Sequence, residues 1–114
     1  MQNKKLKRIG VLGGTFDPAH IGHVKISSIA KKKYKLDYII WAITKKNPFK
    51  KNTHHNLKKR IMLANLISKN KPFIKVRYYE DKIRSNKTYK LIKYLRSKKK
   101  KFEFFFIMGA DNLI

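Results

Sequence analysis

The sequence predicts an α/β fold in which helices flank a single parallel β-sheet, because short apolar runs alternate along the chain with segments of helical periodicity. The order is strand, helix, strand, helix, strand, helix, strand, without an internal repeat or a linker. Connections that contain a helix favour parallel strands joined by right-handed crossovers. With 114 residues, the chain has the size of one domain.

Four apolar runs are expected to form the strands. They are RIGVLGG at 8–14, DYIIWAI at 37–43, PFIKVRYY at 72–79 and KFEFFFIMG at 101–109. Their length and their β-branched and aromatic residues are typical of strands buried in a parallel sheet. Ligands of such sheets bind at the carboxyl ends of the strands. Gly13 and Gly14 close the first run, so we expect them to let the backbone turn sharply there and approach a ligand closely.

Three segments between these runs carry helical patterns, and residues 44–55 have the composition of a loop. The helices are expected over 21–33, 56–68 and 86–97, with Asn56 as the N-cap of the second. Their inward residues would be Val24, Ser27, Ser28 and Ala30, then Leu57, Ile61 and Ala64, and last Leu91, Ile92 and Leu95.

The formal net charge of +24 allows two interpretations. Lys and Arg neutralise phosphates, so one is a nucleic-acid-binding protein. The other is compositional drift, because residues with AT-rich codons dominate and the lysines are scattered in runs such as KKKYK rather than placed on one helix face. We favour drift and expect no nucleic-acid partner, although a basic chain would still attract a phosphorylated substrate.

The composition also indicates in which cellular compartment the protein is expected. The absence of cysteine excludes a disulfide framework and a Cys-based metal site. No apolar stretch reaches the ~18 residues of a membrane span, and the charged start MQNKKLKRIG is unlike a signal peptide. We therefore expect a soluble, cytoplasmic protein without a membrane partner.

The stretch GGTFDPAHIGH at 13–23 combines features of a phosphate site. Its spacing matches neither GxGxxG nor the P-loop. Ile21 would open a helix whose free amides and dipole favour an anion. His20 and His23 lie three residues apart at this helix start, so both can face the same side. Two imidazole donors beside free backbone amides therefore predict binding of a charged phosphate.

Two other interpretations of the histidine pair are open. A metal site would need a third ligand, and none is evident nearby. The pair could also be surface histidines on a turn. The combination with Gly13, Gly14, Asp17 and Pro18 argues against that second alternative.

The same stretch resembles the signature of the H-x-G-H nucleotidyltransferase superfamily, and more narrowly the G-G-T-F-D-P-x-H-x-G-H of bacterial nicotinate-nucleotide adenylyltransferases. The resemblance continues in WAITKKNPFK (41–50), which has Lys45 in place of a proline, in SNKTYKLIKYL (85–95) and in FFFIMGADN (104–112). LKKRIMLANLI is similar to a helix of the same family, and we interpret it as core packing. The implied fold is Rossmann-like, of the nucleotidyltransferase type.

The resemblance implies transfer of the adenylyl group of ATP to nicotinate mononucleotide in NAD biosynthesis, with release of pyrophosphate and without a covalent intermediate. His20 and His23 would be the catalytic residues and would donate hydrogen bonds to the phosphate oxygens. ATP, with Mg²⁺, would contact Gly13, Gly14, Thr15, Phe16, Gly22, His23, Gly109 and Asp111. The mononucleotide would contact Asp17, Lys50 and Thr88. No metal ligands in the protein are implied.

Two alternative functions are open, and the resemblance also bears on the extent of the domain. A sister enzyme could use nicotinamide mononucleotide or pantetheine phosphate, and an inactive remnant could bind nucleic acid through its charge.

Family members continue past G-A-D-N to a tryptophan loop and an S-S/T-x-x-R motif. We therefore expect residues 1–114 to be a single nucleotidyltransferase domain that lacks its C-terminal portion, as a fragment of a longer gene product.

Overall fold

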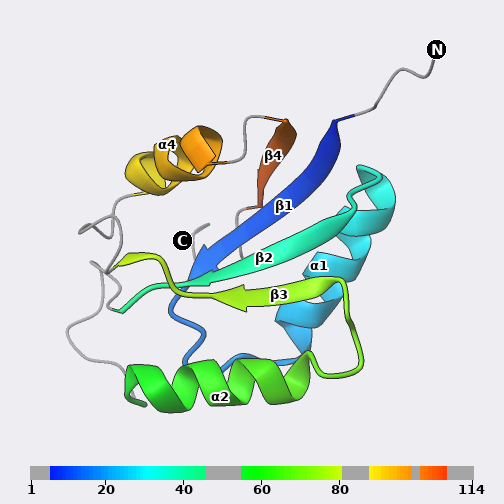
Figure 1. Cartoon of the computed structure of the whole chain (residues 1–114). Coiled ribbons are helices and arrows are strands. Elements are labelled where there is room, and N and C mark those ends of the chain that lie inside the picture. Colours follow the sequence, from blue (N-terminus) through cyan, green and yellow to red (C-terminus); the bar gives the residue numbers. More distant parts are fainter. Residues whose placement is uncertain (1–5, 46–54, 81–87, 99–100, 108–114) are drawn as a thin grey trace.

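The computed structural model describes residues 6–45, 55–80, 88–98 and 101–107. Within these ranges it contains one parallel sheet of four strands in the order β3-β2-β1-β4 (Figure 1). The strands are β1 (Lys7–Gly14), β2 (Tyr38–Ile43), β3 (Ile74–Arg77) and β4 (Phe102–Ile107), and the helices are α1 (Ile21–Lys33), α2 (Leu57–Ile67) and α4 (Thr88–Lys98). The predicted fold class and the predicted order of elements are confirmed.

The register brings the carboxyl ends of β1 and β2 level with each other. Leu12 lies beside Trp41 of β2 and beside Ile107 of β4. Beyond the last paired residues, the backbone N–H of Thr44 donates to the carbonyl of Gly14 at 2.8 Å. The loops that leave β1 and β2 therefore start side by side at one edge of the sheet.

Helices cover both faces of the sheet, with α1 and α2 on one side and α4 on the other (Figure 1). The first face buries Leu12, Ile39, Trp41 and Ile43 against the two helices. The second face buries Ile9, Val11, Ile40, Ala42 and Leu95. Because both faces are covered, the strands read in the sequence as continuous apolar runs rather than as alternating ones.

Strand β3 is shorter at both ends than the predicted 72–79, and one of the predicted inward residues of α1 is not fully buried. Strand β3 begins at Ile74, two residues later than expected, because Pro72 has no N–H for the ladder and the N–H of Ile74 donates to the carbonyl of Lys71 in a turn. In α1, Val24, Ser27 and Ala30 are buried, whereas Ser28 is only half-buried. Asn56 is the N-cap of α2, as predicted, and its side chain accepts from the N–H of Lys59 at 2.8 Å.

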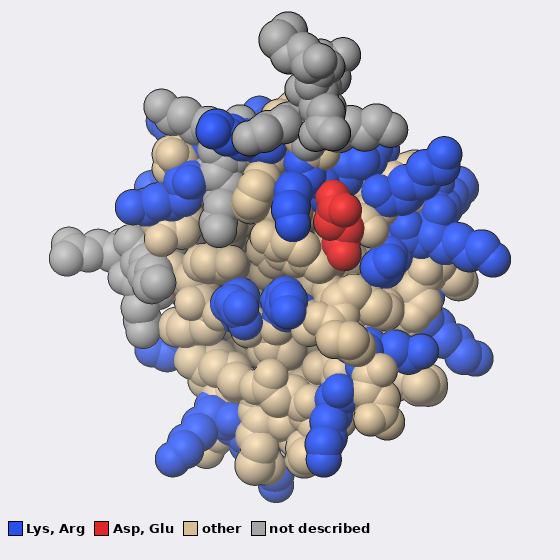
Figure 2. Space-filling model, turned by 45° about the vertical axis from the view of Figure 1, so that its right-hand side comes forward, with Lys and Arg blue, Asp and Glu red and all other residues tan. Residues whose placement is uncertain are grey.

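On the face shown in Figure 2, lysine and arginine side chains are scattered over the surface, and little acidic surface lies among them. The chain has 30 Lys and Arg against 6 Asp and Glu. In the part of the chain that the structure describes, no helix combines the length and the apolar character needed to cross a bilayer.

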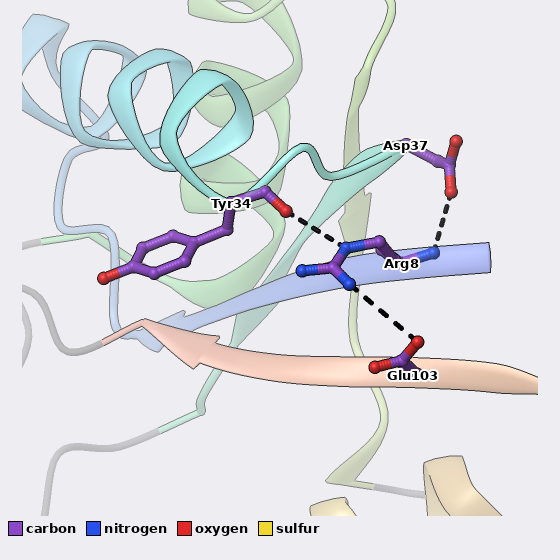
Figure 3. Close-up of polar contacts among 4 residues, drawn as sticks. All are labelled: Arg8, Tyr34, Asp37 and Glu103. Carbon is purple, nitrogen blue, oxygen red and sulfur yellow. Dashed lines mark hydrogen bonds and ion pairs between the residues drawn. The ribbon is translucent and has the colours of Figure 1, made fainter. Parts of the chain in front are cut away.

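At the amino edge of the sheet, Arg8 ties together three elements (Figure 3). Its side-chain Nε donates to the carbonyl of Tyr34 at 3.1 Å, and its backbone N–H donates to Oδ2 of Asp37 at 2.7 Å. The guanidinium also lies 3.9 Å from Glu103 and 4.6 Å from the ring centre of Phe105. These contacts join the start of β1 to the end of α1 and to β4.

Candidate active site

The turn after β1 is made by Phe16, not by the two glycines. Gly13 and Gly14 are paired with Ala42 and Ile43 of β2, and neither has a positive φ. The expectation that these glycines turn the backbone sharply is therefore wrong, because the parallel ladder holds them extended. Among the described residues, the nearest heavy atom to a Cβ on Gly13 would be the carbonyl oxygen of Ala42 at 4.0 Å, which is an ordinary van der Waals contact.

Phe16 adopts a φ of 50°, a left-handed backbone conformation that is costly for a bulky residue. Its ring is 2% exposed and stacks on Trp41 with the ring centres 5.0 Å apart. The centre of the Phe16 ring also lies 4.6 Å from the centre of the His23 ring. Burial of the aromatic ring offsets the backbone strain and fixes the direction in which the chain leaves β1.

His20 and His23 cap the start of α1 in a reciprocal arrangement. Nδ1 of His20 accepts from the backbone N–H of Gly22 at 3.0 Å, and Nδ1 of His23 accepts from the backbone N–H of His20 at 3.0 Å. This is a capping box in which imidazoles take the roles usually played by Ser and Glu. The two ring centres are 4.1 Å apart, which confirms that the histidines share one side of the helix start.

The cap defines where the ring protons lie. Because both Nδ1 atoms accept hydrogen bonds, each neutral imidazole carries its proton on Nε2. The histidines therefore use one nitrogen to hold the helix and direct a donor through the other. This pairing is suited to binding an anion at the helix start.

Gly22 makes room for the ring of His20. A Cβ at this position would lie 2.7 Å from Cε1 and 2.9 Å from Nδ1 of His20. The imidazole thus occupies the space where a side chain would be. The glycine between the histidines is explained by the cap, in addition to the ligand approach expected from the sequence.

Ser27 and Trp41 also hold the first turn of α1 in place through buried hydrogen bonds. The hydroxyl of Ser27 donates to the carbonyl of His23 at 2.8 Å and accepts from the indole N–H of Trp41 at 2.8 Å. Ser27 and Trp41 are fully buried. This chain of hydrogen bonds links β2 to the backbone of His23. A buried indole N–H requires a partner, so the pairing of an inward Ser with the Trp of a neighbouring strand was the available sequence signal.

Arg60 of α2 is the residue that sequence analysis assigned to packing and that the structure places at the site. Its side chain is 1% exposed. Nη1 donates to the carbonyls of Thr15 at 2.8 Å and Thr44 at 2.6 Å, Nη2 to that of Lys45 at 2.7 Å, and Nε to that of His55 at 3.0 Å. One guanidinium therefore joins the loops that follow β1 and β2 to the residue that precedes α2.

Two carboxylates complete this network. Oδ1 of Asp17 accepts from the backbone N–H of His55 at 2.9 Å, and Oε1 of Glu80 accepts from that of Lys45 at 2.8 Å. Burial lowers the pKa of Arg60, whereas the charges of Asp17 and Glu80 act in the opposite direction. An arginine remains protonated throughout the physiological range, so the site contains a fixed buried cation.

The structure brings together most of the residues expected at the site. One segment at the carboxyl end of β1 holds Gly13, Gly14, Thr15, Phe16, Asp17, His20, Gly22 and His23. Thr88 is the first residue of α4, on the opposite face of the sheet. Lys50, Gly109 and Asp111 lie outside the described residues. Among the residues described, no group of three His, Cys, Asp or Glu side chains is placed to hold a metal ion.

Comparisons with known proteins show what this chain is similar to in sequence and fold. The model of a family described as cytidylyltransferase-like matches residues 11–114. A probable nicotinate-nucleotide adenylyltransferase of Pelagibacter ubique (strain HTCC1062) is 60% identical over 112 residues, which cover 98% of this chain and 62% of the relative. A protein of the same description from Ruegeria sp. (strain TM1040) is 37% identical over 105 residues, or 92% of this chain and 55% of the relative. The chain thus spans about half to three fifths of the length of these relatives.

A solved structure shares the fold. The nicotinic acid mononucleotide adenylyltransferase of Plasmodium falciparum, complexed with NaAD, superposes with a TM-score of 0.70 at 22% identity. The similarity covers 88% of this chain and 50% of that one. The arrangement of parallel strands and flanking helices described above is therefore also found in a solved structure.

Proposed function

Since this chain belongs to the cytidylyltransferase-like family, we propose that it forms the part of a nicotinate-nucleotide adenylyltransferase that positions ATP and nicotinate mononucleotide for reaction. The names of the relatives from Pelagibacter ubique and Ruegeria support this choice of substrates. The observation that carries the proposal is the pair of imidazoles, His20 and His23, at the start of α1. The products are nicotinate adenine dinucleotide and pyrophosphate.

The reaction needs no nucleophile from the protein. A phosphate oxygen of the mononucleotide attacks the α-phosphorus of ATP, a new P–O bond forms in line, and the bond to pyrophosphate breaks. Catalysis of such a transfer rests on positioning and on stabilisation of the charge that develops on the phosphoryl oxygens. In this proposal His20 and His23 donate from Nε2 to these oxygens. Removal of one donor of this type costs about 2.7–4 kcal/mol of transition-state stabilisation.

The surroundings of the histidines support an anionic ligand. The first turn of α1 contains no acidic residue, so nothing there opposes a phosphate. In the proposal the nucleotide approaches the end of β1 at Gly13, where a Cβ would be in no closer contact than 4.0 Å with the described residues. In the proposal, Gly13, Gly14, Thr15, Phe16 and Gly22 line the ATP site through their backbone.

Mg²⁺ belongs to the substrate in this proposal. Oδ1 of Asp17, the acidic residue of the β1–α1 loop, already accepts from His55. Mg²⁺ retains water and phosphate ligands when ATP carries it. We therefore assign the ion to the triphosphate oxygens. Asp17, Lys50 and Thr88 remain the proposed contacts to the mononucleotide, and Gly109 and Asp111 the further contacts to ATP.

Release of pyrophosphate tests the proposal. With MgATP present, nicotinate mononucleotide should support turnover better than nicotinamide mononucleotide or pantetheine phosphate. The His23→Ala variant should lose this activity, whereas Lys25→Ala, an exposed position on the same helix, should retain it. Preference for another acceptor would assign the site to a sister enzyme. Binding of polynucleotide without binding of ATP would contradict the proposal.

A further inference from the structure

Within the described residues, the guanidinium of Arg60 bonds to backbone carbonyls alone, and these lie at the carboxyl edge of the sheet. Its four partners come from three places in the chain: Thr15 after β1, Thr44 and Lys45 after β2, and His55 before α2. None of them belongs to a helix or strand. A residue needed only for packing could be apolar at lower desolvation cost. The contacts of Arg60 therefore point to a role in shaping the loops.

The loop between β1 and α1 is held at successive residues on the way to His20. Arg60 binds the carbonyl of Thr15, the ring of Phe16 is stacked on Trp41, and Asp17 accepts from the N–H of His55. The carbonyl of His55 is itself bound by Nε of Arg60. Arg60 thus acts on the loop twice, directly at its first residue and through His55 at its third.

We propose that Arg60 is a positioning residue for the imidazoles of His20 and His23. It fixes the path of residues 15–17, and this path sets the backbone N–H of His20 where His23 Nδ1 accepts it. The inference extends the proposed phosphate-binding role of the two histidines and rests on it for its catalytic consequence. The structural consequence, a fixed ring orientation, can be measured without any substrate.

Lysine cannot replace Arg60 in this network. An ammonium group has the charge but not the planar fork that reaches several carbonyls from one side chain. Arg60→Lys therefore keeps the charge and much of the stem while losing most of the four hydrogen bonds. This variant is the mildest test, and Arg60→Met removes the charge as well.

Arg8 provides a matched control. It also joins separate elements through its guanidinium, to the carbonyl of Tyr34 and to Glu103, but it does so at the amino edge of the sheet. Arg8→Met should lower the stability of the fold without changing the orientation of the His20 and His23 rings. All variants are compared at the same interval below their own Tm, so that general loosening of the fold affects them equally.

The first readout is the ¹⁵N NMR spectrum of the histidine rings in the free protein. In the wild type, His20 and His23 should show the form with the proton on Nε2. Arg60→Lys should shift these signals toward the averaged values of mobile imidazoles, while Arg8→Met should leave them unchanged. Unchanged signals in Arg60→Lys, or equal shifts in both variants, would overturn the proposal regardless of which reaction the protein catalyses.

The second readout is the split between kcat and KM. Misplacement of catalytic groups by about 1 Å lowers rates roughly 100-fold. We expect kcat with MgATP and nicotinate mononucleotide to fall by about this factor in Arg60→Met and by less in Arg60→Lys, with KM for ATP changed far less. A loss of kcat in Arg8→Met as large as in Arg60→Met would show a purely structural role. Altered histidine signals in a protein without this turnover would contradict the proposed function alone.

Discussion

At the residue scale, Gly22 illustrates how one hydrogen atom in place of a side chain supports the cap. The ring of His20 fills the space above its Cα, with Cε1 at 2.7 Å from the place of a Cβ. The cap depends on this close approach, because the N–H of Gly22 is the donor to the same ring.

Gly22→Ala should therefore separate activity from stability. The added methyl group displaces the His20 ring, and loss of the cap costs about 1 kcal/mol. Replacement of glycine by alanine in a helix returns up to about 1 kcal/mol, so the two effects nearly cancel in Tm. Turnover should fall roughly 100-fold, because the imidazole of His20 would no longer be placed to donate a hydrogen bond to the phosphoryl oxygens. Thermal unfolding and pyrophosphate release measure the two quantities, and full activity with a displaced cap would contradict the assigned role of His20.

Ser27 offers a second prediction at this scale. Ser27→Ala leaves the indole N–H of Trp41 buried without its acceptor, which costs about 1–3 kcal/mol. The free energy of unfolding in urea should fall by this amount. Ser28→Ala is the matched control: the residue is half-buried on the same helix, and its change should stay within about 0.5 kcal/mol. Equal effects of the two substitutions would show that the hydrogen bond to Trp41 contributes nothing.

At the scale of elements, the order of strands and helices could be predicted because buried parallel strands leave continuous apolar runs in the sequence. The turn after β1 could not, since a positive φ at Phe16 is stabilised by Trp41, which lies far along the chain. The role of Arg60 could not be predicted either, because the whole segment LKKRIMLANLI is interpreted as core packing and the carbonyl partners of Arg60 lie in separate loops. Its spacing from Leu57 and Ala64 does place it on the inward stripe of α2, and this was the signal that could have identified it.

The contact between Tyr94 of α4 and Tyr79, which follows β3, gives a prediction for how the free energy of unfolding depends on pH. The rings of Tyr79 and Tyr94 lie 5.8 Å apart, and burial raises the pKa of Tyr79 above its ordinary value of 10.0. The neutral phenol of Tyr79 therefore contributes to the stability of the folded state. This contribution is fully present below the pKa of Tyr79 in the unfolded chain and is lost as the pH rises through its pKa in the folded protein.

Tyr79→Phe should flatten this part of the stability profile. Unfolding free energies are measured in urea from neutral pH to above the ordinary tyrosine pKa, and the difference between wild type and variant isolates Tyr79 from the lysines that titrate in the same range. The wild type should lose more stability than the variant over this interval. Parallel profiles would show that the phenol of Tyr79 is not perturbed by folding.

At the scale of the whole molecule, the charge works against compaction. A net charge of +24 on 114 residues means that the basic side chains, which are spread over the face shown in Figure 2, repel one another. Repulsion between exposed charges is screened within about 30 Å at 0.01 M salt and within about 3 Å at 1 M. The folded state should gain more from screening than the extended chain does.

Tm should therefore rise as sodium chloride is increased between these concentrations. The control is a double variant, Lys32→Glu and Lys58→Glu, at two exposed positions on separate helices. Each reversal lowers the net charge by two, so the slope of Tm against salt should become shallower. A falling Tm in the wild type would mean that attractive ion pairs outweigh repulsion.

The single tryptophan of the chain lies at the centre of the candidate site. Trp41 stacks on Phe16, meets the ring of His23 at 5.8 Å and donates to Ser27. Tryptophan fluorescence from these 114 residues therefore originates from one place, beside the rings of Phe16 and His23. Any movement of the β1–α1 loop, any shift of the histidine rings and any loosening of α1 should change the intensity or wavelength of that emission. The protein thus contains its own optical probe, with which ligand titrations can be followed without a label.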